Sequence, residues 1–247
     1  MNKKLLSCFA ISLSLLITIT TRSYASEPAP SIFTKAQQDA ITPNGALELL
    51  KQGNLRFRTD QTIHWNHPVQ VAESASMGQH PFAAVVSCVD SRIPPEAVFD
   101  RGIGDLFVAR VAGNFVNVDI LGSLEFAFLS GTKLIVVLGH SSCGAVHGAC
   151  NGGTSGLLKK ALTNISPAVK SILPKSCAGN DHAAAALVQE VAEANVELNM
   201  KKLCKKSKHL RKDIDSGKYG LIGAMYDITT GEVTFTTDSV VTCKSLK

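Results

Sequence analysis

Two unbroken apolar runs lead directly into residues that bind metals, and this pattern constrains the fold more than any other feature of the chain. The first run, residues 81–87, is followed by Cys88. The second run, residues 133–139, is followed by His140 and Cys143. Apolar runs without alternation indicate strands buried on both faces, as in parallel sheets. Because ligand sites in such sheets lie beyond the carboxyl ends of the strands, the three side chains are expected to form one site.

The chemistry of these three side chains predicts one catalytic zinc ion per subunit. Two thiolates and one imidazole are typical zinc ligands, and three protein ligands leave the fourth position available for chemistry, whereas a structural site usually has four. Taken singly, a buried Cys is usually a small hydrophobe, and a lone His-x-x-Cys is often incidental. The combination of Cys88, His140 and Cys143 at the ends of two strands favours a metal site.

The rest of the chain alternates between helical and extended patterns. Helices are expected from near residue 44, over 119–129 with Asn117 or Asp119 as N-cap, and over the Ala-rich segment 183–204. Further strands are expected at 106–108, 219–226 and 232–236, and the polar segment 59–79 is expected to be irregular. These patterns predict an α/β fold with a mostly parallel central sheet, helices on its faces and an antiparallel C-terminal edge strand.

The first 25 residues have the pattern of an export signal. Lys3 and Lys4 precede an uncharged segment, residues 5–21, and residues 23–25 (Ser-Tyr-Ala) fit a cleavage site before Ser26. The uncharged segment is shorter than the roughly 20 apolar residues of a spanning helix, so no stable membrane anchor is expected after cleavage. The expected division is a signal peptide at 1–25, a flexible leader at 26–42 and a single catalytic domain at 43–247. The expected location is the periplasm, with secretion as the second choice.

The charge of the mature chain gives little support to a polyanion-binding role. The formal net charge is +5, and removal of Lys3, Lys4 and Arg22 with the signal reduces it to +2. A nucleic-acid partner is therefore not expected, because such proteins concentrate many cations on one face. The one basic cluster, residues 201–212, is interpreted as the solvated end of a helix.

The remaining cysteines permit two disulfides. Once Cys8 is removed with the signal and the two zinc cysteines are set aside, four are left: Cys150, Cys177, Cys204 and Cys243. In an oxidising compartment these allow three connectivities, and four free thiols is the alternative. The chain has no Cys-x-x-Cys pair, which disfavours a redox protein.

Each group of predicted metal ligands belongs to a short motif. The motifs are Cys88-Val-Asp90-Ser-Arg92 and His140-Ser-Ser-Cys143-Gly144. Together they resemble the signature of the β-class carbonic anhydrases. The resemblance extends from about residue 43 to 237 and includes the segments 53–57, 110–114 and 223–227. Either motif alone is a weak signal, whereas the combination is highly specific.

The resemblance implies the reversible hydration of CO2 to bicarbonate and a proton, by attack of zinc-bound hydroxide on CO2. It assigns the zinc to Cys88, His140 and Cys143, with Asp90 as acceptor of the hydroxide's hydrogen bond and Arg92 as the partner that keeps Asp90 off the metal. Because two thiolates cancel the charge of Zn²⁺, the water should be less acidic than at a three-histidine site, where its pKa is about 7. Activity is therefore expected to rise above neutral pH.

By the same resemblance, Gln79 and the backbone N–H of Gly144 bind bicarbonate, and Phe107 and Phe126 line an apolar CO2 pocket. The family forms dimers or tetramers with active sites at the dimer interface, so a homodimer or homotetramer is expected. Two alternatives stay open from the sequence. One is a related zinc hydrolase acting on CS2 or COS, and the other is a non-catalytic zinc-binding protein of the envelope.

Overall fold

The chain folds around one five-stranded sheet, as the sequence predicts. The computed structural model describes residues 31–152, 154–172, 177 and 182–246. The strand order is β2-β1-β3-β4-β5, in which the first four strands are parallel and β5 is antiparallel to β4. The strands are β1 (Ala83–Ser87), β2 (Leu106–Arg110), β3 (Leu134–His140), β4 (Gly220–Tyr226) and β5 (Val233–Phe235).

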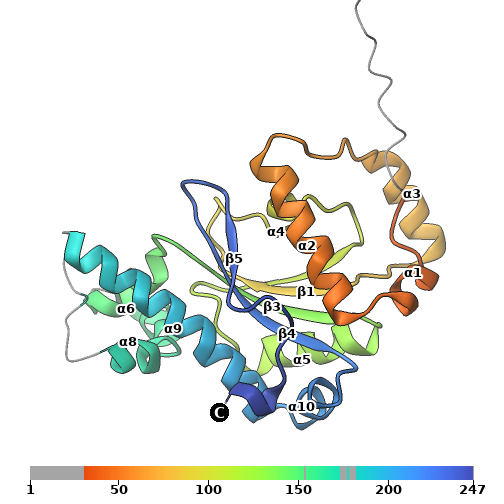
Figure 1. The fold of residues 1–247 in the computed structure, drawn as a ribbon. Coiled ribbons are helices and arrows are strands. Elements are labelled where there is room, and N and C mark those ends of the chain that lie inside the picture. Colours follow the sequence, from red (N-terminus) through yellow and green to blue (C-terminus); the bar gives the residue numbers. More distant parts are fainter. Residues whose placement is uncertain (1–30, 153, 173–176, 178–181, 247) are drawn as a thin grey trace, which may run out of the picture.

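Helices cover both faces of the sheet (Figure 1). α2 and α4 pack on one face, and α5, α10 and much of α9 pack on the other. α6 and α8 lie against the N-terminal half of α9. The helices are α1 (Lys35–Ala40), α2 (Pro43–Arg58), α3 (His67–Met77), α4 (Pro95–Val98), α5 (Val118–Leu129), α6 (Gly144–Asn151), α7 (Gly156–Leu162), α8 (Ser166–Ile172), α9 (His182–Lys206), α10 (Lys208–Asp215) and the 3-10 helix η1 (Cys243–Leu246).

Burial of β1 and β3 explains their sequences, which are apolar except for the last residue of each strand, Ser87 and His140. Every residue of both strands is buried, whereas four of the five residues of the edge strand β2 are only half-buried. Alternate side chains of β1 enter opposite cores, so Val85 joins the core under α2 and Val86 joins the core under α5. A strand that serves two cores has no polar face, which is why the periodicity of an amphipathic strand is missing here.

Two glycines allow α9 to pack closely on the sheet. A Cβ atom added to Gly139 of β3 would lie 2.7 Å from Cγ2 of Val196. One added to Gly223 of β4 would lie 2.7 Å from Cγ1 of the same valine. A side chain at either position would collide with Val196. Glycine at both positions therefore allows the short separation between α9 and the sheet.

The expected flexible leader is wrong for its last part, because α1 lies within it. Thr34 and Gln37 form a capping box at the start of this helix. The Gln38 side chain is fully buried, and its Nε2 donates to the carbonyls of Pro81 (2.8 Å) and Ser130 (3.0 Å). The Thr-x-x-Gln pattern is the local signal of this helix, but the burial that holds α1 in place depends on distant residues.

The segment 59–79 is also more ordered than its polar sequence suggests, because it contains α3. Asn66 caps this helix by accepting from the Val69 N–H, and a proline lies in its first turn. Only Gln70 of the helix is buried, and its Oε1 accepts from the backbone N–H of Ile103. A helix that buries one polar residue has no apolar stripe, so the periodicity of the sequence gives no sign of it.

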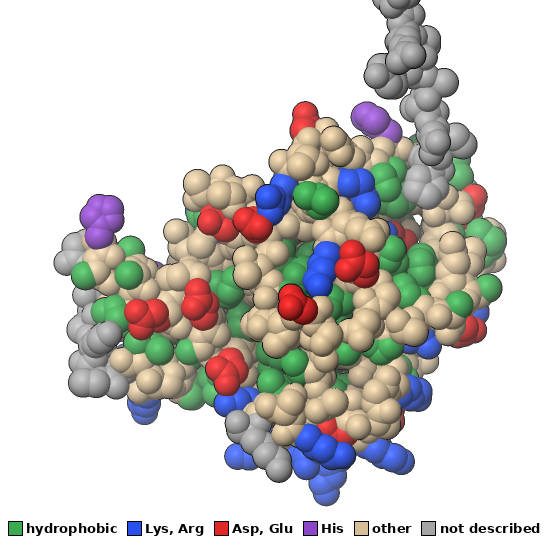
Figure 2. Space-filling view, viewed as in Figure 1, with side chains coloured by type: hydrophobic (Ala, Val, Ile, Leu, Met, Phe, Trp, Pro, Cys, Tyr) green, Lys and Arg blue, Asp and Glu red, His purple; other side chains and the backbone are tan. Residues whose placement is uncertain are grey.

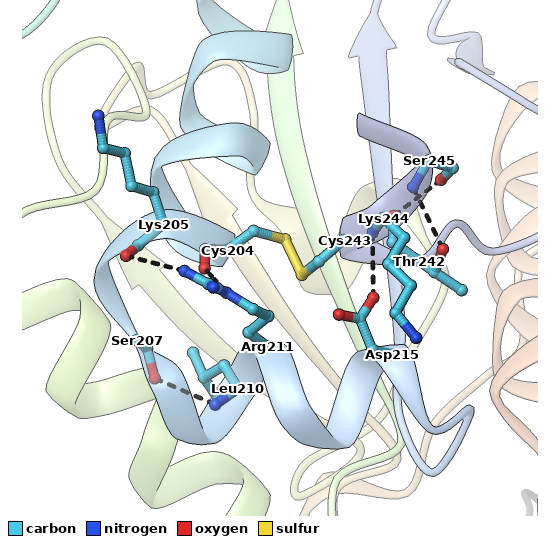
Figure 3. Close-up of a disulfide and its surroundings, with 10 residues drawn as sticks. All are labelled: Cys204, Lys205, Ser207, Leu210, Arg211, Asp215, Thr242, Cys243, Lys244 and Ser245. Atoms are coloured by element: carbon cyan, nitrogen blue, oxygen red, sulfur yellow. Dashed lines mark hydrogen bonds between the residues drawn. A yellow bond between two sulfur atoms is a disulfide. The ribbon is translucent and has the colours of Figure 1, made fainter. Parts of the chain in front are cut away.

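Two disulfides resolve the connectivity that the sequence leaves open. Cys150 pairs with Cys177, and Cys204 pairs with Cys243. The second bond ties the end of α9 to η1 near the C-terminus (Figure 3). Beside it, the Arg211 guanidinium donates to the Cys204 carbonyl at 2.7 Å. The two cysteines reserved for metal, Cys88 and Cys143, are free.

The basic cluster forms the solvated end of a helix, as predicted. The last two residues of α9 are Lys205 and Lys206, and α10 carries Lys208, Arg211 and Lys212. All five side chains are exposed. Figure 2 shows Lys and Arg side chains gathered at the lower end of the molecule, the end at which α10 lies. The expected signal peptide lies outside the described residues. Within the described part, no helix combines the length and apolar character needed to cross a membrane.

Candidate metal centre

Cys88 is the first residue after β1, where the strand delivers it to the carboxyl end of the sheet. Its side chain is buried, with 4% of its surface exposed. The backbone N–H of Gly113, in the loop after β2, donates to its Sγ at 3.3 Å. A sulfur that accepts a backbone hydrogen bond is better able to carry the negative charge that metal binding requires.

His140 is the last residue of β3 and is fully buried. Its Nδ1 lies 2.9 Å from the carbonyl oxygen of Ser141. A carbonyl can only accept, so Nδ1 carries the proton and Nε2 presents a lone pair. Nε2 is itself buried and has no hydrogen-bond partner among the described residues. A buried acceptor without a partner is costly, and a metal ion at this position would satisfy it.

Cys143 completes the cluster as the N-cap residue of α6. Its side chain is 1% exposed. The two Sγ atoms and the histidine nitrogen lie within 4.8 Å of one another. Ser142, between the ligands, has a φ of +53°, a conformation that non-glycine residues rarely adopt. The structure therefore brings together all three predicted ligands, and two soft sulfurs with one imidazole fit zinc.

The two sulfurs influence each other's protonation strongly. The hydrogen bond with Cys143 lowers the pKa of Cys88 to about 4, against the opposing effect of burial. The same contact, together with burial, raises the pKa of Cys143. Charge on one sulfur disfavours charge on its neighbour, so both thiolates form together only beside a cation.

Asp90 and Arg92 form the predicted pair on the loop after Cys88. Nε of Arg92 donates to Oδ1 of Asp90 at 2.9 Å, and Nη2 donates to Oδ2 at 2.7 Å. The backbone N–H of Arg92 adds a third bond to Oδ1 at 3.0 Å. This pairing holds the pKa of Asp90 well below its usual range, so the carboxylate is ionised at any working pH. Arg92 itself is half exposed, and its Nη2 also approaches the Ser142 carbonyl.

Arg110 is a site residue that lies outside the two metal-ligand motifs. It ends β2 in register with Ser87, the residue before Cys88. Nε donates to the Cys88 carbonyl at 2.8 Å, and Nη2 donates to the Asp90 carbonyl at 2.6 Å. One guanidinium thus fixes the backbone that carries both a metal ligand and the paired carboxylate. Its place at the end of a strand beside Cys88 follows only from the sheet register.

Gly144 lies where a substrate-binding backbone donor is expected. It is the first residue of α6 and is exposed, and a Cβ atom added to it would meet nothing within 4 Å. The first N–H groups of a helix have no partner inside the helix and favour anions. The exposure of Gly144 and the open space at its Cα are compatible with the predicted contact to bicarbonate.

Gln79 lies at the opposite end of the sheet from the cluster. It comes between α3 and the start of β1, and its side chain is exposed. Cys88 lies at the other end of β1, a strand of five residues that spans roughly 17 Å. Within one subunit Gln79 does not join the ligands, so its role stays a prediction that requires a second subunit.

Phe107 and Phe126 contact each other at the open edge of the sheet. Phe107 belongs to β2, Phe126 to α5, and their ring centroids are 5.8 Å apart in an edge-on arrangement. Phe107 is half-buried, whereas 56% of Phe126 is exposed. The pair forms an apolar surface next to an edge strand, and its role in a CO2 pocket stays a prediction.

Comparisons with known proteins agree with this geometry. The sequence profile of the carbonic anhydrase family matches residues 83–233. A carbonic anhydrase of Mycolicibacterium smegmatis is 34% identical over 197 residues, covering 77% of this chain and 92% of the relative. Carbonic anhydrase 2 of Mycobacterium tuberculosis is 33% identical over 190 residues, covering 76% of this chain and 90% of the relative.

Solved structures agree as well. One of two tetrameric β-carbonic anhydrases from Sordaria macrospora superposes with a TM-score of 0.62 at 27% identity, covering 68% of this chain and 86% of that one. The Coccomyxa β-carbonic anhydrase, with a TM-score of 0.62 at 23% identity over 70% of this chain and 79% of that one, supports the fold. The profile match, the curated relatives and the buried Cys-His-Cys cluster together show that this chain belongs to the β class of the carbonic anhydrase family, the enzymes of CO2 hydration.

Proposed function

We propose that this protein catalyses the reversible hydration of CO2 with one Zn²⁺ per subunit held by Cys88, His140 and Cys143. The observation that carries the proposal is the buried, unpartnered Nε2 of His140 among two free buried thiols, all within the described part of the chain. A zinc ion held by these residues would act as a Lewis acid and lower the pKa of the water that it binds. The thiolate charges reduce that effect, so the rate is expected to rise above neutral pH.

The Asp90–Arg92 pair would leave a coordination position open on a metal ion held by the cluster. Arg92 occupies both carboxylate oxygens with bonds of 2.7 to 3.0 Å, so Asp90 is held away from the ligand cluster. Oδ2 accepts only one of these bonds and retains capacity for another hydrogen bond. An ionised Asp90 can therefore accept a hydrogen bond from an O–H group and orient that group toward the substrate.

The substrate is expected to lie over the first turn of α6. The Gly144 N–H donates to an oxygen of bicarbonate there, and Gln79 of a second subunit adds a side-chain donor. Phe107 and Phe126 provide the apolar surface for CO2. These roles are supported by the open space at Gly144 and by the paired rings.

A homodimer or homotetramer is the proposed assembly. The half-buried edge strand β2 carries apolar residues at four of its five positions, and β2 has a free edge. Exposed edges of this kind invite pairing with another chain. The neighbouring α5 exposes large apolar side chains, namely Val118, Phe126 and Leu129, which are 79%, 56% and 89% exposed. The two Sordaria macrospora β-carbonic anhydrases are tetrameric, which supports an oligomer here.

The proposed location is the periplasm, after cleavage of the export signal. The two disulfides support this location, because such bonds persist in oxidising compartments. Thiol labelling of the protein in a periplasmic fraction, with and without a reductant, would test it. A protein found in the reducing cytosol with both disulfides absent would contradict the location without affecting the catalytic proposal.

Stopped-flow CO2 hydration on the purified protein tests the function. Rapid hydration that increases with pH is expected, with no comparable hydrolysis of COS or CS2 in parallel assays. Preferential hydrolysis of COS or CS2 would assign a related hydrolase. If fully zinc-loaded protein showed none of the three activities, the proposal would be overturned, and a non-catalytic zinc-binding protein would be the remaining interpretation.

A further inference from the structure

We propose that Asn195 and Asn199, two buried asparagines of α9, are positioning residues for the metal centre. They act through the loop after β2, whose Gly113 donates to the sulfur of Cys88. The inference rests on the proposed zinc site, but it concerns residues that do not contact the metal. It predicts that zinc retention depends on a helix packed on the opposite side of that loop.

Hydrogen bonds connect α9 to the ligand without a gap. Nδ2 of Asn195 donates to the Gly113 carbonyl at 2.9 Å. The backbone N–H of Val116 donates to Oδ1 of Asn199 at 2.8 Å. Gly113 in turn donates its N–H to Sγ of Cys88 at 3.3 Å. The two asparagines thus hold both ends of the short segment that carries the sulfur's donor.

The asparagines also hold each other. Nδ2 of Asn199 donates to Oδ1 of Asn195 at 3.0 Å and to the Asn195 carbonyl at 2.7 Å. This contact fixes the orientation of both amides, because Oδ1 of Asn195 must accept while its Nδ2 faces Gly113. The pair acts as one unit, so loss of either amide is expected to disturb the other.

Their burial indicates a specific role. Both side chains have 0% of their surface exposed and lie on a helix face that is otherwise apolar. The neighbours on that face are Val188, Val191, Ala192, Val196, Met200 and Leu203. Burying a polar amide costs free energy unless its hydrogen bonds are made, and an aliphatic residue would avoid that cost. The amides are therefore explained by what they hold rather than by packing.

The held loop needs such support because it contains an unfavourable backbone conformation at Asn114. This residue has a φ of +41°, in the left-handed region that non-glycine residues rarely adopt, and it follows Gly113, whose φ is +85°. A side chain at Gly113 would be strained by that φ, and its Cβ atom would lie 2.4 Å from Cδ1 of Ile165. Strained segments persist where the surrounding structure over-determines them. The asparagines supply that constraint and aim the Gly113 N–H at Cys88.

The test compares Asn195→Leu with Gln38→Leu. Gln38 is an equally buried amide that donates to two backbone carbonyls, but it lies at the other end of the sheet. The readouts are the zinc dissociation rate to a chromophoric chelator and the sulfur-to-metal charge-transfer band of the Co²⁺-substituted protein. Asn195→Leu is expected to release zinc about 10- to 100-fold faster and to shift the band, as outer-shell changes do. Gln38→Leu is expected to lower the melting temperature alone.

The inference would be overturned if Asn195→Leu lowered the melting temperature as much as Gln38→Leu does, but left the zinc dissociation rate and the Co²⁺ charge-transfer band unchanged. If Asn195→Leu does not fold, Asn195→Ala and Asn199→Ala are measured instead, since both leave the apolar packing uncrowded. A wild-type protein that fails to bind zinc would refute the proposed function. A wild-type protein that binds zinc normally, beside variants that do the same, would refute only the positioning role.

Discussion

The two ends of the central sheet use the same interaction for different purposes. At the carboxyl end, Asn195 donates to the Gly113 carbonyl beside the metal ligands. At the amino-terminal end, Gln38 donates to the carbonyls of Pro81 and Ser130, in the loops that lead into β1 and β3. Both amides are fully buried. A buried amide therefore does not identify a functional site by itself, and the groups that its loop carries decide its role.

The titratable groups at the two ends of the sheet also serve different purposes. The carboxyl end gathers two thiols and an imidazole, which are soft ligands placed within 4.8 Å of one another. The amino-terminal end buries Asp105 near the half-buried Arg101, and burial raises the pKa of Asp105 to about 6. The Arg101 guanidinium lies over the Phe82 ring and donates to the Leu49 carbonyl, so its contacts stabilise the fold. We expect changes at the thiols and the imidazole to alter catalysis, and changes at Asp105 or Arg101 to alter stability.

The largest effect is expected from Cys143→Ser. Removal of a direct ligand should reduce both bound zinc and the CO2 hydration rate by more than about a hundredfold, beyond the range of an outer-shell change. Metal analysis and stopped-flow hydration measure the two quantities. The matched control is the double variant Cys204→Ser with Cys243→Ser, which removes sulfur far from the site and should retain zinc. Hydration at the wild-type rate in Cys143→Ser would contradict the assignment of the ligand.

Arg92→Leu is expected to lower kcat/KM by roughly 10- to 100-fold while zinc content stays near that of the wild type. The variant loses the bidentate bond between Arg92 and Asp90, which is proposed to keep the carboxylate off the metal. Arg92→Lys keeps the charge but lacks the fork, so it should recover only part of the rate. Wild-type kinetics in Arg92→Leu would show that the pair is only structural.

Arg110→Met should have a smaller effect, about tenfold on both zinc retention and hydration rate. It releases the backbone carbonyls of Cys88 and Asp90 together, so the two readouts should change in parallel. Arg110→Lys can restore one of the two bonds and should lie between the variant and the wild type. A fall in melting temperature without any change in zinc retention would show that Arg110 stabilises the fold and has no role in the metal site.

The smallest effect on catalysis is expected from Asp105→Asn at the amino-terminal end. The folded-state pKa of Asp105 is raised from 3.8 to about 6, so its contribution to stability is present at low pH and is lost as pH rises through 6. The wild type should therefore lose about 2 kcal/mol more than the variant in unfolding free energy between roughly pH 4 and pH 7. Denaturant unfolding at the two pH values measures this difference. Parallel pH dependence in both proteins, or a changed hydration rate in the variant, would contradict the contrast between the two ends.

Local patterns predict the strands and the ligands, and long-range contacts explain what they miss. β1 and β3 are evident because burial on both faces leaves an unbroken apolar run, and the ligands follow directly in the chain. The partner of Cys88, Gly113, is 25 residues away, and Asn195 is 82 residues from Gly113. α1 and α3 bury one polar residue each, so they leave no periodic signal. Disulfide pairing also depends on tertiary contact, and spacing alone could not rank it.

Titration of zinc into metal-free protein, with stopped-flow CO2 hydration at each step, tests the central claim most directly. The account predicts that the rate rises in proportion to bound zinc and reaches its plateau at one zinc per subunit. A fully occupied site without hydration, or an undiminished rate without zinc, would contradict it.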